Sequence, residues 1–174
     1  MCNVEDNSIQ FTEFDAVYLE RSYVWLTEPE IKRLTLSPDI TKQSQQLWYD
    51  SLSERNDYMI WGVLCDGIPV GAVGLKKIDY INHSAEYFGY IGEKKYWGKG
   101  IGTQMLSFAI DEARKLDVKK LELHVSDDNT RAIALYNKIG FQETIEYDKK
   151  SLNIRHYQYQ ITTEETCYQK SSRD

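Results

Sequence analysis

Residues 96–102 read Tyr-Trp-Gly-Lys-Gly-Ile-Gly and stand directly ahead of an amphipathic helical pattern. Glycine accepts positive φ angles and has no Cβ, so alternating glycines bring several backbone N–H groups close around one object. The first turn of the helix adds N–H donors that have no partner inside the helix, together with the positive end of the helix dipole. The segment therefore predicts a turn into a helix that holds an anion, above all a phosphate.

The spacing of the glycines narrows the kind of phosphate site. A dinucleotide fingerprint needs glycines at its first, third and sixth places, and Thr103 holds the sixth place here. A nucleotide-triphosphatase loop ends in Gly-Lys-Ser/Thr, which this segment lacks. Two readings remain, namely a different type of phosphate loop and a simple tight connection between a strand and a helix.

The segments around the glycines predict a strand, a helix and a second strand. Apolar residues recur at helical spacing behind the loop, at Ile101, Met105, Phe108, Ala109, Ala113 and Leu116. Residues 85–91 before the loop and 119–126 after the helix have strand patterns. Such a succession implies a right-handed crossover between parallel neighbours, and ligands of these sheets bind at the carboxyl ends of the strands. We therefore expect the phosphate ligand between the strands that end near Ile91 and Ser126.

The N-terminal third predicts helices after a first edge strand at residues 8–12. A helical pattern over residues 15–36 breaks where Thr27, Pro29 and Glu30 have the spacing of a capped helix start. A further helix is expected over residues 41–55. Three of its residues are expected to face the core, namely Leu47, Trp48 and Leu52.

The middle and the end of the chain predict antiparallel strands around the crossover. Residues 58–65 and 70–80 flank Asp66-Gly67, a dipeptide typical of a hairpin turn, and lead into the strand at 85–91. Later, Asp127 or Asp128 is expected to cap a helix over residues 130–139, which Gly140 ends. A closing hairpin is expected from strands over residues 141–147 and 154–162.

These elements predict one α/β domain over residues 1–163, with a mixed sheet flanked by helices, and a polar, frayed tail at 164–174. The three cysteines, Cys2, Cys65 and Cys167, have no metal or redox spacing, and no metal is expected. The chain contains no apolar run long enough to span a bilayer, and its first residues lack a secretory signal, so we expect no membrane association and a cytoplasmic location.

The net charge of −6 bears on the partners of the chain. This charge argues against a broad surface that binds the phosphate backbone of nucleic acids, and it suits a cationic partner better. The alternative is that a modest negative charge serves solubility alone.

A second motif runs from Asn129 to Phe141, reading Asn-Thr-Arg-Ala-Ile-Ala-Leu-Tyr-Asn-Lys-Ile-Gly-Phe. Asn129 and Tyr136 are two helical turns apart and therefore lie along one face of the helix. By spacing alone, Tyr136 could be a core aromatic and Asn129 a helix-end residue.

Together the two motifs resemble the GNAT superfamily of acyl-CoA-dependent N-acetyltransferases. Members carry Gln or Arg, two residues, Gly, one residue, and Gly or Ala, which corresponds here to Trp97, Gly100 and Gly102. Trp97 departs from the usual residue and removes one possible polar contact. The later family pattern is matched at Asn129, Ala132, Tyr136, Gly140 and Phe141. The resemblance implies a mostly antiparallel sheet whose parallel strands splay at an acyl-CoA cleft.

The resemblance also implies acetyl-CoA as cosubstrate and a role for each matching residue. Backbone groups of Tyr90 and Ile91 would hold the pantetheine arm and polarise the thioester carbonyl, Asn129 would contact that arm, and Tyr136 would protonate the leaving thiolate. The pyrophosphate would be held by backbone amides of Trp97, Gly98, Lys99, Gly100, Ile101 and Gly102.

The attacking amine must lose a proton, so a base or a proton wire is needed. Glu86 is the first candidate because it lies on the strand that ends at the cleft, and an acid often occupies this place in similar proteins. Alternatively, Glu86 is an ordinary solvated carboxylate of the strand without a catalytic role. His124 and Asp79 are weaker candidates for the base. No covalent enzyme intermediate is expected, since Cys65 and Cys167 lack an activating base.

The acceptor remains open at this stage. In the family the N-terminal helices and the closing hairpin build its pocket, which Trp25, Trp48, Tyr49 and Trp61 could line, although ordinary core packing is the stronger reading for them. The candidate acceptors are an amino sugar, a polyamine, an aminoglycoside and a protein N-terminus. The alternative to an enzyme is a sensor or scaffold domain that binds acyl-CoA without turnover. In both cases the chain could form a homodimer.

Overall fold

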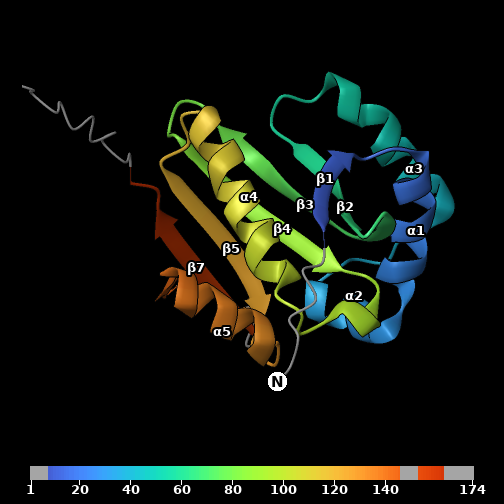
Figure 1. Cartoon of the computed structure of the whole chain (residues 1–174). Coiled ribbons are helices and arrows are strands. Elements are labelled where there is room, and N and C mark those ends of the chain that lie inside the picture. Colours follow the sequence, from blue (N-terminus) through green and yellow to red (C-terminus); the bar gives the residue numbers. More distant parts are fainter. Residues whose placement is uncertain (1–7, 146–152, 163–174) are drawn as a thin grey trace, which may run out of the picture.

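The computed structural model describes residues 8–145 and 153–162, which form one seven-stranded sheet in the order β1-β2-β3-β4-β5-β7-β6 (Figure 1). Among the described strands, β4 and β5 are parallel and every other neighbouring pair is antiparallel. The predicted mixed, mostly antiparallel sheet is confirmed. The strands are β1 (Ile9–Glu13), β2 (Met59–Cys65), β3 (Ile68–Asp79), β4 (Ser84–Ile91), β5 (Lys120–Ser126), β6 (Gln142–Thr144) and β7 (Ile154–Gln160).

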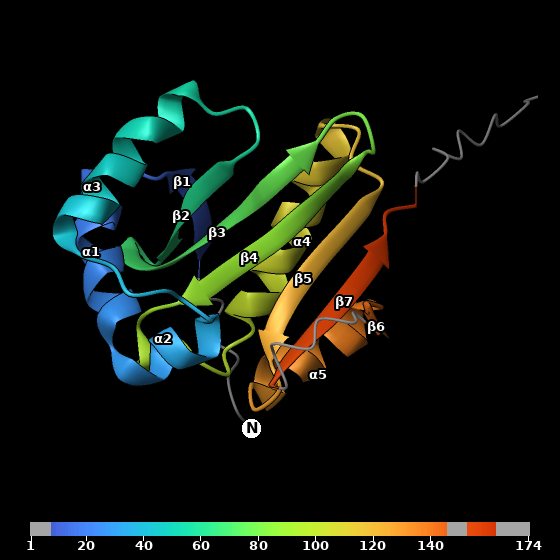
Figure 2. The ribbon, with the colours of Figure 1, turned by 180° about the vertical axis from the view of Figure 1, so that it is seen from behind.

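Helices cover both faces of the sheet (Figures 1 and 2). On one face α4 and α5 pack over β3, β4, β5 and β7, and their apolar side chains form the larger core. On the other face α1, α2 and α3 gather beside β2, β3 and the end of β4, around a smaller core. The helices are α1 (Ala16–Thr27), α2 (Pro29–Thr35), α3 (Lys42–Ser51), α4 (Ile101–Lys115) and α5 (Thr130–Ile139), with short 3-10 turns η1 (Leu52–Glu54) and η2 (Lys94–Tyr96).

Alternation along the strands separates the two cores. Val63 and Val73 are fully buried in the larger core, whereas Ala72 belongs to the smaller core on the other face. The predicted hairpin between β2 and β3 is confirmed, since Asp66 and Gly67 have φ angles of 51° and 78°. A two-residue turn with both φ angles positive matches the twist of the strands that it joins.

The predicted start of α2 is wrong by one residue. The capping side chain is that of Glu28, whose carboxylate accepts a hydrogen bond from the Ile31 N–H at 2.8 Å. The Thr27 hydroxyl instead donates to the Tyr23 carbonyl within α1. The reason lies in Pro29, which disfavours helical backbone in the residue before it and so makes Glu28 the extended N-cap.

The predicted cap of α5 is also wrong. Asn129 is the N-cap, and its side-chain oxygen accepts a hydrogen bond from the Ala132 N–H at 3.3 Å. The carboxylate of Asp128 accepts from the Ser126 hydroxyl and pairs with Arg33 of α2, so it is engaged in tertiary contacts. Gly140, with a φ of 109°, ends the helix as predicted.

The third helix is shorter than predicted, and its inward face differs. Thr41 and Ser44 form a capping box, but the α-helix ends at Ser51. Leu47 is 64% exposed, whereas Gln45 is buried and donates a hydrogen bond to Ser22 of α1. A buried polar contact between the two helices, invisible in the apolar pattern, turns the helix away from the predicted orientation. Leu52 lies half-buried in η1.

The closing hairpin is confirmed as antiparallel pairing of β6 with β7. The strand β7 lies between β5 and β6, so the last strand of the chain inserts into the sheet beside the crossover. The turn of this hairpin and the tail at 164–174 lie outside the described residues, as do Cys2 and Cys167.

Candidate active site

The parallel strands β4 and β5 separate where the pocket begins. They are paired only from Ser84 to Glu86 and from Lys120 to Glu122, although both continue beyond these residues. The predicted splay is therefore confirmed. A pocket of about 750 Å³ occupies the widened gap, and its wall includes Phe88–Ile91 of β4 and His124 of β5. The glycine loop, the starts of α4 and α5, and the helices α1–α3 complete the wall.

The glycine loop presents backbone to this pocket. Gly98 and Gly100 have φ angles of 73° and 81°, and a Cβ placed on either would meet no atom within 4 Å. The positive φ, rather than crowding, therefore requires glycine at both positions. Asp15, Glu28, Thr41 and Asn129 each accept a hydrogen bond at the start of their helices, whereas α4 begins at Gly100 without a side-chain cap. Its first-turn N–H groups are the donors that a phosphate would use.

Trp97 connects the loop to the end of β4. Its indole N–H donates a hydrogen bond to the Ile91 carbonyl at 2.8 Å, and the Arg131 guanidinium lies over its ring, 4.7 Å from the ring centre. The family position that usually carries Gln or Arg therefore holds a side chain with a structural contact and a cation beside it. Lys99 is the one predicted loop residue outside the pocket wall, and its ammonium lies 5.4 Å from the centre of the Tyr96 ring.

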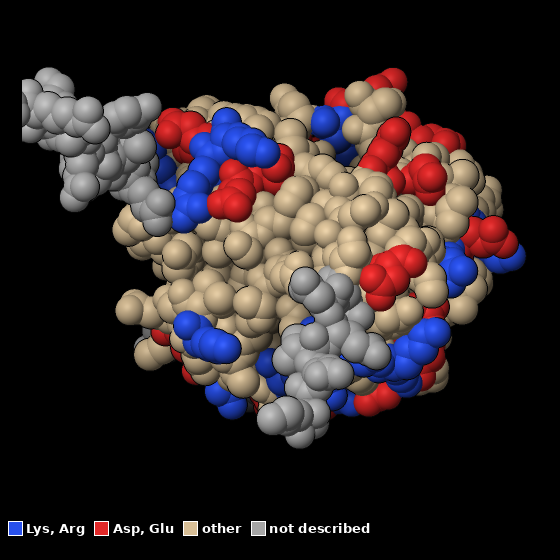
Figure 3. Space-filling model, in the orientation of Figure 1, with Lys and Arg blue, Asp and Glu red and all other residues tan. Residues whose placement is uncertain are grey.

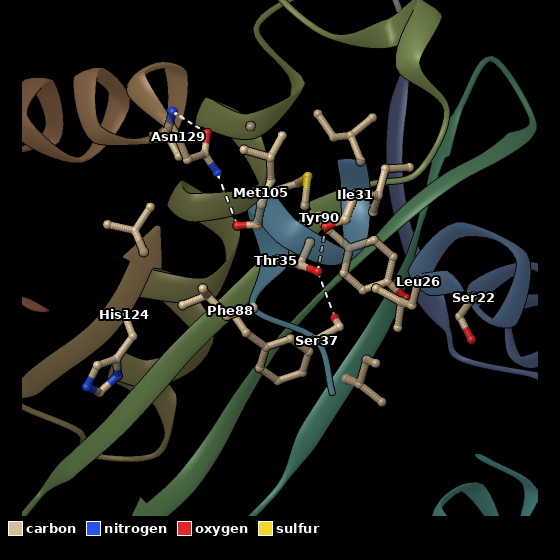
Figure 4. A pocket seen from close by; sticks show the side chains of 18 of the residues that line it. Ser22, Leu26, Ile31, Thr35, Ser37, Phe88, Tyr90, Met105, His124 and Asn129 are labelled. Carbon is tan, nitrogen blue, oxygen red and sulfur yellow. Dashed lines mark hydrogen bonds between the residues drawn. The ribbon is translucent and has the colours of Figure 1, made fainter. Parts of the chain in front are cut away.

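The predicted residues Tyr90 and Ile91 lie on the pocket wall at the end of β4. Tyr90 pairs with Ala72 of β3, and a Cβ on Gly71 would come within 2.1 Å of the Tyr90 carbonyl oxygen. Glycine at position 71 thus lets β3 approach the wall closely. Burial raises the pKa of the Tyr90 hydroxyl well above its ordinary value. Figure 4 shows the Tyr90 side chain beside Leu26 and Ile31, within the half of the pocket that the N-terminal helices build.

Asn129 and Tyr136 both line the pocket from α5, as their spacing predicts. The Asn129 amide caps the helix through its oxygen and donates to the Leu34 carbonyl of α2 at 3.4 Å (Figure 4). Tyr136 is only 8% exposed, and its ring lies against those of Tyr87 and Phe141. Burial raises the pKa of Tyr136 well above its ordinary value, so the hydroxyl keeps its proton at neutral pH.

Glu86 lies behind the pocket wall rather than on it. Its buried carboxylate receives the Lys76 and Lys77 ammonium groups at 3.0 and 2.7 Å. Burial raises the pKa of Glu86, but the hydrogen bonds from Lys77 and Lys76 outweigh this effect and leave the pKa below its ordinary value. A carboxylate held in this way is a weak proton acceptor, and this geometry does not favour direct proton transfer from an amine to Glu86.

The two weaker candidates are far apart in the structure. His124 lines the pocket at one side (Figure 4), and its Nδ1 lies 3.3 Å from the nearer Glu86 oxygen. Asp79 is the last residue of β3, at the opposite end of β4 from the pocket, where its carboxylate accepts hydrogen bonds from the backbone N–H groups of Ile81 and Asn82. Asp79 therefore organises a turn, and His124 is the candidate that meets the pocket.

One of the four aromatic residues considered for the acceptor pocket lines it. That residue is Trp48, whereas Trp25 packs on Gly92, and Trp61 packs on Phe108 of α4 in the larger core, on the other face of the sheet. Tyr49 borders a separate hollow beside Phe14. Sequence reasoning missed Tyr58 and Phe88, which line the pocket beside Trp48. Strand periodicity alone does not show which face of β4 the pocket occupies.

Several findings bear on other functions. Within residues 8–145 and 153–162, no group of three or more His, Cys, Asp or Glu side chains has the geometry of a metal site. None of the helices in those ranges is long and apolar enough to cross a bilayer. On the face seen in Figure 3, basic and acidic side chains of the described residues are interspersed around an uncharged centre.

Comparisons with known proteins agree with this geometry. The spermidine N(1)-acetyltransferase of Escherichia coli K12 is 39% identical over 80 residues, which make up 45% of this chain and 42% of that protein. An uncharacterized N-acetyltransferase of Methanocaldococcus jannaschii is 30% identical over 108 residues, or 59% of this chain and 47% of that protein. The matches thus span less than half the length of these curated relatives.

Solved structures share the fold over most of the chain. The spermidine N-acetyltransferase of Vibrio cholerae in complex with CoA and spermine superposes with a TM-score of 0.78 at 20% identity, covering 88% of this chain and 95% of that one. A domain from M. jannaschii superposes with a TM-score of 0.77 at 22% identity, and the match covers 89% of this chain and 99% of that domain. The model of the GNAT acetyltransferase family matches residues 19–141, and the chain belongs to that family.

Proposed function

We propose that this protein transfers the acetyl group of acetyl-CoA to a primary amine by direct attack. One observation carries the proposal. The uncapped start of α4, behind two glycines with positive φ, opens onto the same pocket as the buried Tyr136 hydroxyl. An anion site and a protonated acid in one pocket are what a thioester with a pyrophosphate-bearing leaving group requires.

The residues present fit acetyl-CoA. The first-turn N–H groups of α4, together with those of Trp97 to Gly102, would hold the pyrophosphate, and Lys99 would add positive charge near the loop. The pocket volume of about 750 Å³ suits a large, elongated ligand. Asn129, already oriented by its bonds to Ala132 and Leu34, would meet the pantetheine arm.

The bound thioester supplies the electrophilic carbonyl carbon that the amine attacks. Beyond Glu86 one edge of β4 has no neighbouring strand, so backbone groups around Tyr90 and Ile91 would orient that carbonyl, with the Ile91 oxygen already held by Trp97. The Tyr136 hydroxyl would donate its proton to the sulfur as the thiolate leaves. Cys65 is buried, and burial raises the pKa of its thiol, which agrees with transfer without a covalent enzyme intermediate.

For the proton of the amine, we assign the accepting role to His124 and a positioning role to Glu86. His124 lies on the pocket wall, whereas Glu86 lies behind it. Donation from Nδ1 of the neutral imidazole to the Glu86 carboxylate, 3.3 Å away, selects the tautomer whose Nε2 carries the lone pair. Glu86 thus acts through His124, in place of the direct role that the sequence suggested.

The test is thiol release from acetyl-CoA in the presence of primary amines, alongside direct measurement of acetyl-CoA binding. We expect binding and amine-dependent release together. Binding without release for any amine would contradict the proposal and support a sensor or scaffold domain. Absence of binding would contradict both readings.

The setting of the protein follows as part of the proposal. We expect it to work in the cytoplasm, where acetyl-CoA and small amines meet, without nucleic acid, membrane or metal. A homodimer is also expected, and one spermidine N-acetyltransferase structure from V. cholerae is dodecameric. Light scattering of the purified full chain measures the assembly directly.

A further inference from the structure

We propose that the acceptor is a primary amine with one positive charge and an apolar, aromatic-sized body, rather than a polyamine. This inference rests on the proposed function and concerns the half of the pocket that lies beside α1–α3. We name this half the acceptor half and define it by six residues of its wall: Leu26, Ile31, Ile40, Trp48, Tyr58 and Phe88.

Aromatic rings form one side of the acceptor half. The Trp48 and Tyr58 rings meet edge to face with centres 5.9 Å apart, and Tyr58 and Phe88 follow at 5.3 Å. The Trp48 ring also packs edge to face on Phe14 of the smaller core, with ring centres 5.6 Å apart, and this contact anchors the aromatic row to the core. Such a row favours a flat or branched apolar group through its large contact area and the geometry of its rings.

Aliphatic side chains face this row from the N-terminal helices. Leu26 comes from α1, Ile31 from α2 and Ile40 from the loop before α3. The hydroxyls of this half are already bonded within the fold, since Ser22 pairs with Gln45, and Thr35 pairs with Ser37 and donates to the Ile31 carbonyl. Leu26, Ile31 and Tyr90 all belong to the smaller core and line the pocket (Figure 4).

Charge is nearly absent from this wall. Among the described residues that line the pocket, Asp39 is the one carboxylate, and its side chain is 96% exposed and paired with Lys32. The cations on the wall are also engaged, Lys76 with Glu86 and Arg131 over the Trp97 ring. The carboxylates that give the chain its negative net charge are therefore largely absent from the described pocket wall.

A polyamine would bring a second ammonium group into this environment. An ammonium removed from water without a carboxylate or several carbonyls around it is strongly unfavourable. The reacting amine avoids this cost because it loses its proton and becomes a neutral amide. One reacting nitrogen on an apolar body therefore fits the acceptor half, and a second charged nitrogen does not.

The experiment compares hexylamine with 1,6-diaminohexane, which differ by one terminal amino group, at fixed acetyl-CoA. We expect kcat/KM to favour hexylamine by about tenfold or more, and 2-phenylethylamine to exceed spermidine similarly. A preference for the diamine or spermidine would overturn the inference and leave the proposed function standing. Thiol release from none of these amines, but from another primary amine, would overturn the inference alone. Release from no primary amine would overturn the proposed function and the inference with it.

Two variants locate the preference in the acceptor half. Trp48→Ala should raise the KM for 2-phenylethylamine about tenfold and leave that for acetyl-CoA unchanged, with the exposed neighbour Leu47→Ala as matched control. Ile40→Asp, in a loop that tolerates exposure, should narrow the ratio of hexylamine to diaminohexane. Circular dichroism of each variant establishes that it is folded. A folded Trp48→Ala with unchanged KM for the aromatic amine would overturn the assignment.

Discussion

The two ends of the pocket differ in the groups that form their walls, which are backbone groups at one end and side chains at the other. At the α4 end the wall is backbone, with positive-φ glycines and a helix start that has no side-chain cap. At the α1–α3 end every α-helix start is capped by a side chain, and the wall combines apolar and aromatic side chains with polar groups that are bonded within the fold. The first end is suited to an anion and the second to an apolar body.

This difference explains how the loop tolerates Trp97 where the family usually has Gln or Arg. A site made of N–H groups depends on φ angles more than on side chains, so only glycines are constrained there. A site made of side chains changes its preference with each substitution. The anion end therefore carries a recognisable motif, and the acceptor end does not.

The largest expected effect lies where the two ends meet. Tyr136→Phe removes the hydroxyl and keeps the ring that packs on Tyr87 and Phe141. We expect kcat to fall about a hundredfold or more, because general acid catalysis contributes at least this factor, with acetyl-CoA affinity nearly unchanged. Steady-state kinetics and calorimetry measure the two quantities. Unchanged turnover would remove Tyr136 from the acid role.

The next effect tests the backbone end. Gly100→Ala places a Cβ on a residue with a φ of 81°, so the loop must shift, and we expect acetyl-CoA affinity to fall about tenfold or more. Gly67→Ala is the matched control, because its φ of 78° and open surroundings impose similar strain in the β2–β3 turn, away from the pocket. The control should lose similar stability and keep its affinity. Equal loss of affinity in both variants would mean that general strain is responsible.

A smaller effect tests the charged group behind the wall. The folded-state pKa of Glu86 is below its ordinary value of 4.5, so the ionised carboxylate stabilises the fold above that pH, and this contribution is lost as the pH falls through the lower folded value. Glu86→Gln should cost about 1 kcal/mol near neutral pH, a modest figure because the lysine partners are partly exposed, and should flatten the decline of stability in acid.

Urea unfolding at several pH values measures this effect. The same variant should also move the acid limb of the kcat/KM profile, since Glu86 positions His124 in the proposed mechanism. Loss of stability with an unmoved pH profile would make Glu86 structural only.

The smallest effect sharpens the comparison most directly. Trp97→Gln introduces one of the usual family residues at the loop and replaces the indole N–H, which donates to the Ile91 carbonyl, with a side-chain amide. We expect acetyl-CoA affinity to change by less than about fivefold, because the N–H groups stay in place. A large loss would show that the indole and its stacked Arg131, rather than the backbone, carry the anion end.

Much of the fold was predictable because its signals are local. The hairpin at Asp66-Gly67, the helical spacing from Ile101 to Leu116 and the Gly140 helix end each depend on residues close in sequence. The helix starts were harder to predict. Glu28 rather than Thr27, and Asn129 rather than Asp127 or Asp128, provide the caps, because neighbouring polar residues compete and tertiary contacts such as Arg33 with Asp128 select among them.

By itself the sequence determined the glycine loop, the strands and helix around it, and the Asn129-to-Phe141 motif, since φ preference and periodicity act over a few residues. Only the tertiary structure decided that Glu86 meets Lys76 across β3 and β4 and His124 across β4 and β5. It also decided which aromatic residues face the pocket. These outcomes depend on strand register and on where β4 and β5 separate, which are set by packing between segments far apart in the chain.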